Sequence, residues 1–180
     1  MQKFVITGGP CTGKTTIIKE IEKIGLPVMH EVATEVINNE LNRAKKNPNH
    51  KPLLPQTDLK DFQLKILEKQ LRKERKIKAN VVFYDRSIVD TLAYLIHGKY
   101  NLNHLFDHHI KSAGYTKIFF LEQLPFYLTD EVRKESPECA KAIHDCILQT
   151  YKSYKFDIIT VPAMDIEKRV EFILRNSIKK

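Results

Sequence analysis

The sequence predicts an α/β fold in which a parallel sheet carries helices on both of its faces. Short apolar runs alternate with longer amphipathic segments along the whole chain. The apolar runs are continuous, as expected for strands that are buried on both faces. No internal repeat, low-complexity tract or long linker divides the 180 residues, so we predict one domain, 1–180.

The composition excludes several classes of protein. Hydrophobic residues make up 42% and charged residues 29% of the chain, which is typical of a soluble globular protein rather than a disordered one. No apolar run approaches the roughly 18 residues of a membrane span, and the first residues lack the apolar stretch of a signal peptide. The cysteines are sparse and unpaired in spacing, which indicates free thiols in a reducing compartment. We therefore expect a cytoplasmic protein with no membrane partner.

The formal net charge of +8 leaves two interpretations open. Much of the excess lies in the run 72–78, which reads Arg-Lys-Glu-Arg-Lys-Ile-Lys. A basic run can attract nucleic acid, but it is more often the solvated face of a helix. We favour the solvated face, and nothing in the sequence predicts the oligomeric state.

Residues 1–41 predict two strands and two helices. The run 4–7 is apolar and precedes a glycine turn. The segment 14–24 is predicted to be a helix that ends at Gly25, because isoleucines recur along one face of it. Residues 28–30 form the second predicted strand, and 32–41 form the second predicted helix.

The middle of the chain begins with a loop and returns to the alternating pattern. Residues 42–57 hold three prolines among lysines and asparagines, which predicts a loop. Thr57 is expected to cap a helix that runs to about residue 78. An apolar strand is predicted at 81–84, and a helix at 88–97 that the following glycine ends.

The last third repeats the alternation. A helix is predicted to end near Gly114, and a strand follows at 118–121. The polar segment of about 125–136 is expected to act as a lid. The next helix has an N-cap and a first-position proline, Ser136 and Pro137, and is expected to run through Tyr154. The fifth strand is predicted at 157–161, and Asp165 opens the last helix.

The glycine turn after the first strand fits the pattern G-x-x-x-x-G-K-[ST] at every fixed position. Its glycines allow successive backbone N–H groups to face phosphate oxygens, and the following helix adds its N-terminal dipole. Lys14 would supply a point charge to the phosphates, and the Thr15 hydroxyl would coordinate Mg²⁺. The alternative is an ordinary glycine turn with a surface lysine. The preceding strand and following helix favour a nucleotide-binding P-loop formed by Gly8, Gly9, Pro10, Cys11, Thr12, Gly13, Lys14, Thr15 and Thr16.

An acid and an arginine follow the third strand. Ligands of open parallel sheets lie at the carboxyl ends of the strands, so Asp85 is expected beside the P-loop as a second ligand of Mg²⁺. Its alternative role is to cap the next helix. Arg86 offers a fork of donors that suits the transferred phosphoryl group or the acceptor, or it forms an ion pair at the helix start.

Two further charged residues are candidates for catalysis. Glu31 follows the second strand and could accept a proton from an acceptor hydroxyl, or it could simply favour the start of the next helix. Arg133 lies in the polar segment after the fourth strand, where it could close over the phosphates or remain a solvated loop charge.

With these residues in place, the sequence resembles the AAA-domain family of small predicted ATPases and kinases. It is also similar to the ribosylnicotinamide kinase domain of bifunctional NAD-biosynthesis regulators. The resemblance spans nearly the whole chain, and only its first segment is sharply diagnostic. The matching segments are 8–16, 30–32, 83–87, 90–94, 119–121, 127–133, Tyr151, 161–162 and 169–174.

This resemblance implies a kinase-type P-loop fold with five parallel strands in the order 2-3-1-4-5, and it implies ATP and Mg²⁺. The run from Asp85 to Ser87 is similar to that of deoxynucleoside kinases, and its Asp-Arg pair also occurs in thymidylate kinases. By the same analogy Glu31 is the base, Arg133 is a lid arginine, and the turn at Pro162 lies near the adenine. The lysine- and proline-rich segment 42–57 departs from the family where acceptor-binding elements usually lie.

Together these observations predict an ATP-dependent phosphotransferase that acts on a small-molecule hydroxyl or phosphate. The acceptor, a nucleoside, nucleotide or related metabolite, would lie between the helical region of about 32–78 and the ends of the strands. Two alternatives stay open. One is an NTPase switch or nucleotide sensor, and the other is a nucleic-acid end kinase that uses the basic run. The absence of an Asn-Lys-x-Asp signal for guanine favours ATP over GTP.

Overall fold

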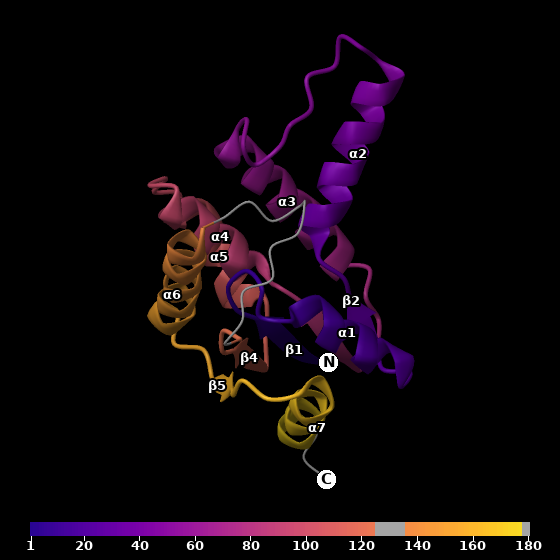
Figure 1. Cartoon of the computed structure of the whole chain (residues 1–180), viewed down its shortest axis with the longest axis vertical. Coiled ribbons are helices and arrows are strands. Elements are labelled where there is room, and N and C mark those ends of the chain that lie inside the picture. The colour runs from indigo at the N-terminus through magenta and orange to yellow at the C-terminus, as the bar shows by residue number, and fades with distance from the viewer. Residues whose placement is uncertain (125–135, 178–180) are drawn as a thin grey trace.

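The computed structural model describes residues 1–124 and 136–177, and within them it contains one parallel sheet (Figure 1). The strands lie in the order β2-β3-β1-β4-β5, which confirms the predicted fold class and strand order. β1 pairs with β3 on one side and with β4 on the other, so the chain segment after β1 leaves from the middle of the sheet. The strands are β1 Gln2–Thr7, β2 Val28–Met29, β3 Val81–Asp85, β4 Lys117–Leu121 and β5 Ile158–Val161.

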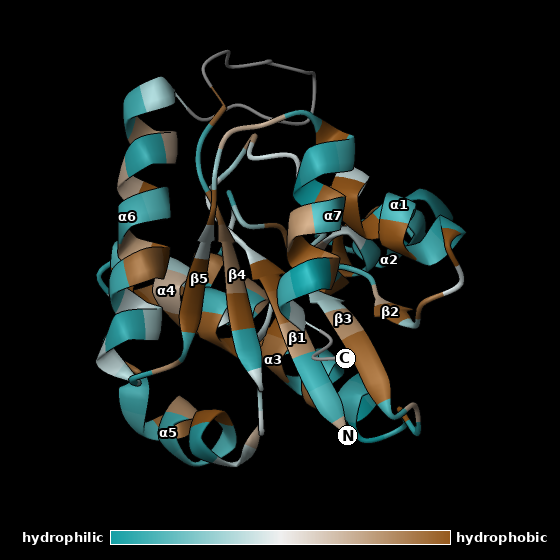
Figure 2. Ribbon diagram, turned by 90° about the horizontal axis from the view of Figure 1, so that it is seen from below, coloured by the Kyte–Doolittle hydropathy of each residue, from teal (hydrophilic) through white to brown (hydrophobic). Residues whose placement is uncertain are grey.

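Helices cover both faces of the sheet, as Figure 2 shows. α1 and α7 pack against one face, and side chains from α2 to α6 form the larger core on the other. In Figure 1, α2 and α3 project beyond the rest of the molecule. The helices are α1 Lys14–Lys23, α2 Val32–Lys46, α3 Leu59–Glu74, α4 Ile88–His97, α5 Asn103–Ser112, α6 Pro137–Ser153 and α7 Ile166–Ser177.

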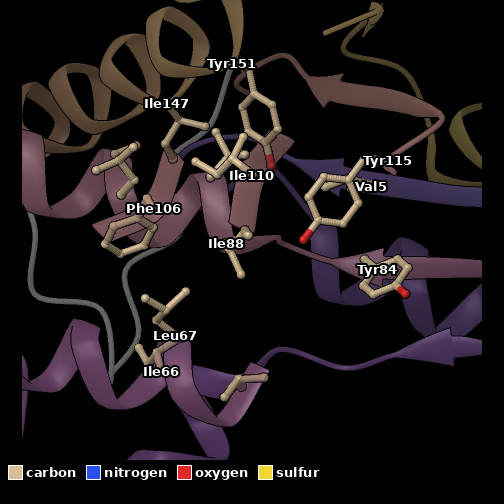
Figure 3. Close-up of a cluster of buried hydrophobic side chains, with 14 of the residues drawn as sticks. Val5, Ile66, Leu67, Tyr84, Ile88, Phe106, Ile110, Tyr115, Ile147 and Tyr151 are labelled. Atoms are coloured by element: carbon tan, nitrogen blue, oxygen red, sulfur yellow. The ribbon is translucent and has the colours of Figure 1, made fainter. Parts of the chain in front are cut away.

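The central strand, β1, is apolar from Phe4 to Ile6, where both of its faces are buried. Phe4 and Ile6 point to the core beneath α1 and α7, whereas Val5 points to the larger core. The same alternation places Phe83 on the first side and Tyr84 on the second. Figure 3 shows the larger core, where residues of the sheet meet apolar side chains of the covering helices. Two buried faces explain why the sequence shows a continuous apolar run and no polar alternation.

Three predicted boundaries in the middle of the chain were wrong. α2 continues through residues 42–46, so the connecting segment is 47–58 rather than 42–57. The helix ends there because a proline disfavours helical geometry in the residue before it, and Asn47, which precedes Pro48, is extended. Asp58, not Thr57, caps α3 by accepting a hydrogen bond from Asp61 N at 2.9 Å. α3 then ends at Glu74 instead of near residue 78.

Other helix signals were read correctly. α4 has the predicted bounds, and α6 begins with the predicted N-cap, because the Ser136 side chain accepts a hydrogen bond from Cys139 N. Most of the predicted lid, 125–135, lies outside the described residues. None of the helices in the described ranges has the length and apolar character needed to cross a bilayer.

Candidate functional site

The turn from β1 to α1 is built around close backbone contacts. Gly8 and Gly13 adopt positive φ angles of 144° and 84°. A Cβ atom on Gly8 would lie 2.8 Å from the Leu121 carbonyl oxygen, and one on Gly9 would lie 2.6 Å from His144 Cβ. Side chains at these two positions would therefore push the turn away from β4 and α6. This gives the first glycines of the motif a packing role in addition to the expected freedom of the loop.

Lys14 is buried within this turn. Its Nζ donates hydrogen bonds to the Gly9 carbonyl oxygen at 2.6 Å and to Thr12 Oγ1 at 3.2 Å. Burial, reinforced by the nearby charge of Arg86, lowers the Lys14 pKa to about 7, although the acids Asp85, Glu31 and Asp90 oppose the change. An ammonium group held in such a place is stabilised by any anion that enters. The position is suited to phosphate.

One large cavity opens at the carboxyl ends of the strands and has a volume of about 1370 Å³. The predicted nucleotide-binding residues from Pro10 to Thr16 line it, whereas Gly8, Gly9 and Pro162 do not. Thr15 is exposed there at the start of α1. Although Pro162 is absent from the lining, the turn that it begins contributes Ala163 and Met164.

Asp85 ends β3 beside Ile6 of β1, at the edge of the sheet where the P-loop begins, but it does not line the cavity. The carboxylate is buried, and its Oδ1 atom has no hydrogen-bond partner in the described part of the chain. Burial and the nearby charge of Glu31 raise the Asp85 pKa to about 6, against the opposing effects of Lys14 and Arg86.

Mg²⁺ fits the chemistry of these residues. An unpartnered buried carboxylate oxygen and a threonine hydroxyl are both ligands of the kind that Mg²⁺ takes, usually alongside waters and substrate phosphates. Asp85 and Thr15 would hold the ion. The described residues contain no group of three or more histidine, cysteine or acidic side chains that could hold a metal by itself. An ion held by Asp85 and Thr15 would take its other ligands from waters and nucleotide phosphates.

Arg86 and Glu31 both line the cavity and form an ion pair with each other. Arg86 Nε donates to Glu31 Oε1 at 2.6 Å, and the guanidinium lies over the Tyr94 ring at 5.5 Å. Burial of Glu31 would raise its pKa, but the cations Arg86 and Lys14 outweigh burial and lower it. Glu31 makes no capping bond to the backbone of α2; its other bond comes from the Thr34 hydroxyl at 3.0 Å. The ion pair that was one alternative for Arg86 is thus present, and its partner is the predicted base.

The backbone of Arg86 is unusual, because its φ angle is +68°. Residues other than glycine seldom adopt this conformation, and where they do the surrounding structure must hold them. The next residue, Ser87, begins α4 with a capping box that it shares with Asp90. This cap, rather than Asp85, starts the helix, so the alternative capping role of Asp85 was wrong.

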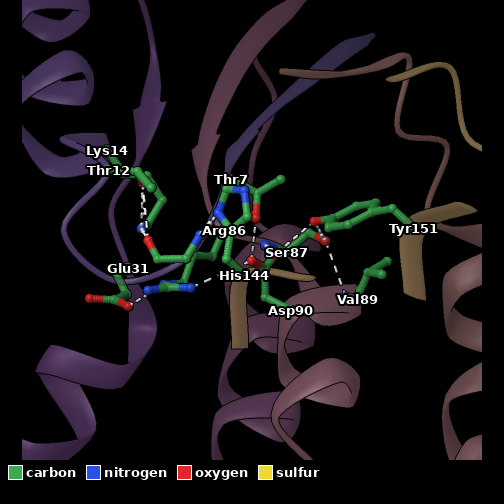
Figure 4. Close-up of polar contacts among 11 residues, drawn as sticks. Thr7, Thr12, Lys14, Glu31, Arg86, Ser87, Val89, Asp90, His144 and Tyr151 are labelled. Carbon is green, nitrogen blue, oxygen red and sulfur yellow. Dashed lines mark hydrogen bonds and ion pairs between the residues drawn. The ribbon is translucent and has the colours of Figure 1, made fainter. Parts of the chain in front are cut away.

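A buried polar network that the sequence did not reveal lies behind Arg86 (Figure 4). Asp90 accepts hydrogen bonds from the Thr7 hydroxyl, from Ser87 N at 2.8 Å and from the Tyr151 hydroxyl at 2.5 Å. Asp90 Oδ1 also lies 3.6 Å from Arg86 Nη1. The network joins β1, α4 and α6 beneath the arginine.

Arg169 is a buried residue to which the sequence assigned no role. Its guanidinium donates to the carbonyl oxygens of Thr12 at 2.7 Å, Pro162 at 2.9 Å and Glu122 at 3.0 Å. It therefore ties the P-loop to the ends of β4 and β5. An arginine on an amphipathic helix carries no sequence signal for this role, because its partners are backbone atoms far apart in the chain. The predicted lid arginine, Arg133, lies outside the described residues.

The cavity continues away from the P-loop into the space between α2, α3 and α4. This far end is lined mainly by Ile37, Pro55, Phe62, Gln63, Ile66, Gln70 and Tyr94. Gln63 is 5% exposed and makes no hydrogen bond through its side chain within the described residues. Gln63 lies between Phe62 and Ile66, which recur at helical spacing on the apolar face of this segment, so a polar residue on that face was the available signal.

The basic run begins in the last turn of α3, two residues after Gln70 of the cavity lining. It leads into the first residue of β3, Val81, which pairs with Gln2 at the start of β1. The P-loop follows the opposite end of β1. Within the run, Arg72 pairs with Glu68, and Lys73 pairs with Glu35 at 2.8 Å. These contacts agree with the interpretation of the run as a solvated helix face.

Comparisons with known proteins agree with this architecture. A family model described as AAA domain matches residues 3–169. None of the curated protein sequences matches the chain. Among solved structures, NadR protein in complex with NR is 17% identical with a TM-score of 0.71, over 99% of this chain and 52% of that one. The chain therefore spans about half the length of that NadR chain.

Two similar structures are of deoxyadenosine kinase from M. mycoides. The form with products dCMP and a flexible dCDP bound is 16% identical, with a TM-score of 0.64, over 99% of this chain and 100% of that one. The form with bound dATP is 14% identical, with a TM-score of 0.65, over 98% of each chain. At these identities the likeness shows a shared fold.

Proposed function

The chain belongs to the AAA domain family, and from this premise we propose that it is an ATP- and Mg²⁺-dependent phosphotransferase. The acceptor is a hydroxyl or phosphate of a nucleoside, nucleotide or related metabolite. One observation carries the proposal: the cavity runs without interruption from the P-loop to a second compartment between α2, α3 and α4. Arg86 lies over the Tyr94 ring of the second compartment, and the charges of Arg86 and Glu31 act on Lys14 of the P-loop, so we place the transfer point at this pair. A protein that only hydrolyses nucleotide has no need of the second compartment.

The nucleotide end binds and orients the triphosphate. Backbone N–H groups at the start of α1 and the ammonium of Lys14 face the phosphate oxygens. Asp85 and Thr15 would hold Mg²⁺, which supplies positive charge to the phosphates when it is bound. Arg86 carries positive charge to the point between nucleotide and acceptor, where charge is shared during transfer.

The acceptor end holds a hydroxyl or phosphate oxygen against the terminal phosphoryl group. For a hydroxyl acceptor, the oxygen forms a bond to phosphorus as the bond between phosphorus and the leaving ADP oxygen breaks. The hydroxyl proton passes to the Glu31 carboxylate. The cations Arg86 and Lys14 lower the Glu31 pKa, so Glu31 is a carboxylate before transfer. A carboxylate is the form that can accept the proton. Tyr94 and Phe62 provide aromatic surface for a flat acceptor, and Gln63 provides an amide that makes no hydrogen bond to the described part of the chain.

An acceptor screen with labelled ATP tests this proposal. We expect wild-type protein to transfer label to at least one member of a panel of nucleosides, nucleotides and ribosides, and to release little free phosphate without it. Lys14→Ala should abolish the transfer. Phosphate release at one slow rate with every acceptor would instead indicate the switch or sensor function.

A second comparison addresses the base. Glu31→Gln should lose transfer to a hydroxyl acceptor while ATP binding persists, because the amide retains much of the shape but cannot take the proton. Undiminished transfer would remove Glu31 from the mechanism. Charge reversal at Arg72, Lys73 and Arg75 should leave transfer unchanged; a steep loss, together with strong salt dependence, would support the nucleic-acid end kinase.

A further inference from the structure

α6 reaches the candidate site at two points. His144 and Tyr151 are seven residues apart, so they lie on the same side of the helix two turns from each other. His144 contacts the P-loop, and Tyr151 contacts the network behind Arg86 (Figure 4). Neither residue lines the cavity. Their partners, however, contact two of the cations that line the cavity. Gly9, the partner of His144, accepts a hydrogen bond from Lys14, and Asp90, the partner of Tyr151, forms an ion pair with Arg86.

The first contact joins His144 to Gly9. Gly9 N donates a hydrogen bond to His144 Nδ1 at 3.1 Å, and the imidazole packs on the Phe120 ring with centroids 4.6 Å apart. Nδ1 must be unprotonated to accept this bond, so the proton of the neutral ring is on Nε2. Burial lowers the His144 pKa, which favours this neutral form. The charges of Lys14 and Lys141 lower the His144 pKa further, whereas those of Asp145 and Glu122 raise it.

The other side of the same glycine holds the P-loop lysine. The Gly9 carbonyl oxygen accepts hydrogen bonds from Lys14 Nζ at 2.6 Å and from Thr12 Oγ1 at 3.0 Å. The backbone groups of Gly9 thus connect α6 on one side to the ammonium group on the other. A glycine without this support has wide conformational freedom. His144 therefore fixes the residue that fixes Lys14.

The second contact joins Tyr151 to Asp90, which lies beside Arg86. The Tyr151 hydroxyl donates to Asp90 Oδ2 at 2.5 Å and lies 2.7 Å from Ser87 Oγ. Asp90 in turn lies beside Arg86 Nη1. Because the hydroxyl has one proton and gives it to Asp90, Ser87 is the donor in the second bond. Tyr151 thus holds the carboxylate that lies beside the strained arginine.

We propose that α6 positions both phosphate-binding cations, Lys14 through His144 and Gly9, and Arg86 through Tyr151 and Asp90. The inference rests on the proposed function, which places both cations on the phosphates. His144 and Tyr151 are positioning residues, since each acts through a partner. One helix then sets the geometry of the nucleotide end and of the transfer point together.

Binding of Mg²⁺ and a fluorescent ATP analogue tests the first half. In His144→Phe the ring can still pack on Phe120, but Gly9 N loses its acceptor. A smaller fraction of P-loops is then competent, and we expect affinity to fall roughly tenfold. His144→Asn offers an amide oxygen near the position of Nδ1 and should stay within about twofold of wild type.

A matched control comes from the same helix. Cys146 Sγ donates to the Ala93 carbonyl oxygen at 3.3 Å and joins α6 to α4 without touching Gly9 or Asp90. Cys146→Ala should leave the affinity unchanged. Equal affinities for the Phe and Asn variants would overturn the role of His144. If His144→Phe does not fold, the ¹⁵N shift of His144 in wild type decides: an unprotonated Nδ1 supports the contact, and a protonated Nδ1 overturns it.

The second half predicts a different signature. Tyr151→Phe removes only the hydroxyl and keeps the ring beside Phe156. We expect the rate of phosphoryl transfer from labelled ATP to fall roughly tenfold, with analogue affinity within about twofold of wild type. An unchanged rate would overturn the role of Tyr151. If wild-type protein fails to bind the analogue, the proposed function itself is refuted. If wild type binds but the His144 and Tyr151 variants match it in affinity and transfer rate, only the positioning by α6 is refuted.

Discussion

Two buried carboxylates in this molecule have opposite surroundings. Glu40, on α2, is 2% exposed and accepts hydrogen bonds from Lys65 Nζ at 2.6 Å and from Leu53 N at 3.1 Å. His50 and Arg43 complete its shell. Asp85, on β3, is also buried, yet its Oδ1 atom has no partner among the described residues. Both carboxylates have little exposed surface, but the described residues provide hydrogen bonds to both oxygens of Glu40 and none to Asp85 Oδ1.

The two pKa values follow from this difference. The hydrogen bond from Lys65 outweighs burial and lowers the Glu40 pKa to about 2, whereas burial raises the Asp85 pKa to about 6. Glu40 stabilises the fold, because it connects α2 and α3 to the segment 47–58 between them. We expect the ionised Asp85 carboxylate to destabilise the ligand-free fold, and we propose that it binds a cation. A buried group that the protein leaves unsatisfied is therefore a better guide to a ligand site than burial alone.

The largest expected effect separates the lysines of the two regions. Lys14 lies in the P-loop and its Nζ bonds to neutral oxygens, whereas Lys65 pairs with Glu40. Lys14→Met should lower transfer by roughly 10³-fold with little loss of stability, because the charge acts on phosphate. Lys65→Met should lower the free energy of unfolding and leave transfer near wild type. Transfer rates and urea unfolding of both variants check this, and similar profiles would break the comparison.

The Glu40 cluster should carry a measurable part of the stability. Glu40→Gln removes the charge that four donors surround, and we expect the free energy of unfolding to fall by about 2–3 kcal/mol. Glu35→Gln is the matched control on the same helix. Glu35 bonds to Lys69 and Lys73, but it is 44% exposed, so its loss should cost less than about 1 kcal/mol. Urea unfolding measures both, and equal losses would contradict the special role of Glu40.

Acid should remove the same stabilisation. The folded pKa of Glu40 is about 2, below its ordinary value of 4.5, so the unfolded chain binds the proton more readily. Its contribution is fully present above pH 4.5 and is lost as the pH falls from 4.5 towards 2. The difference in unfolding free energy between wild type and Glu40→Gln should shrink across that window. A difference that stays constant with pH would show that the charge contributes nothing.

The two glutamines of α3 extend the contrast to the acceptor end. Gln63 and Gln70 are both buried and both line the cavity. Within residues 1–124 and 136–177, Gln70 Nε2 donates to Glu74 at 3.1 Å, whereas the Gln63 side chain makes no hydrogen bond. Gln63→Leu should cost little stability and raise the KM of the acceptor identified by the screen about tenfold. Gln70→Leu should cost about 1 kcal/mol of stability and leave the KM unchanged. Steady-state kinetics measures the KM and urea unfolding measures the stability. A stability loss in Gln63→Leu with a raised KM in Gln70→Leu would contradict this assignment.

The sequence predicted the parts of this molecule that depend on local pattern. Strands, helix caps such as Ser136, and the P-loop spacing are all encoded by neighbouring residues. The end of α2 was missed because residues 42–46 show no apolar periodicity and precede a proline-rich segment, although Arg43, Ala44 and the two lysines after them favour a helix. The partners of Glu40, Asp90 and Arg169 were also missed. Their contacts join segments that are far apart in the chain, so only the fold shows which buried charges are satisfied.

The smallest expected effect has the opposite sign from the loss at Glu40. Asp85→Asn replaces a buried charge that lacks a partner with a neutral amide of similar shape, so the Mg²⁺-free protein should become more stable by about 1 kcal/mol. Thermal unfolding with a chelator present would measure this gain at neutral pH, where the wild-type carboxylate is mostly ionised. The same variant should lose most of its Mg²⁺-dependent transfer. A protein that is destabilised by Asp85→Asn would show that hidden contacts satisfy the carboxylate, and Asp85 would then belong with Glu40 rather than opposite it.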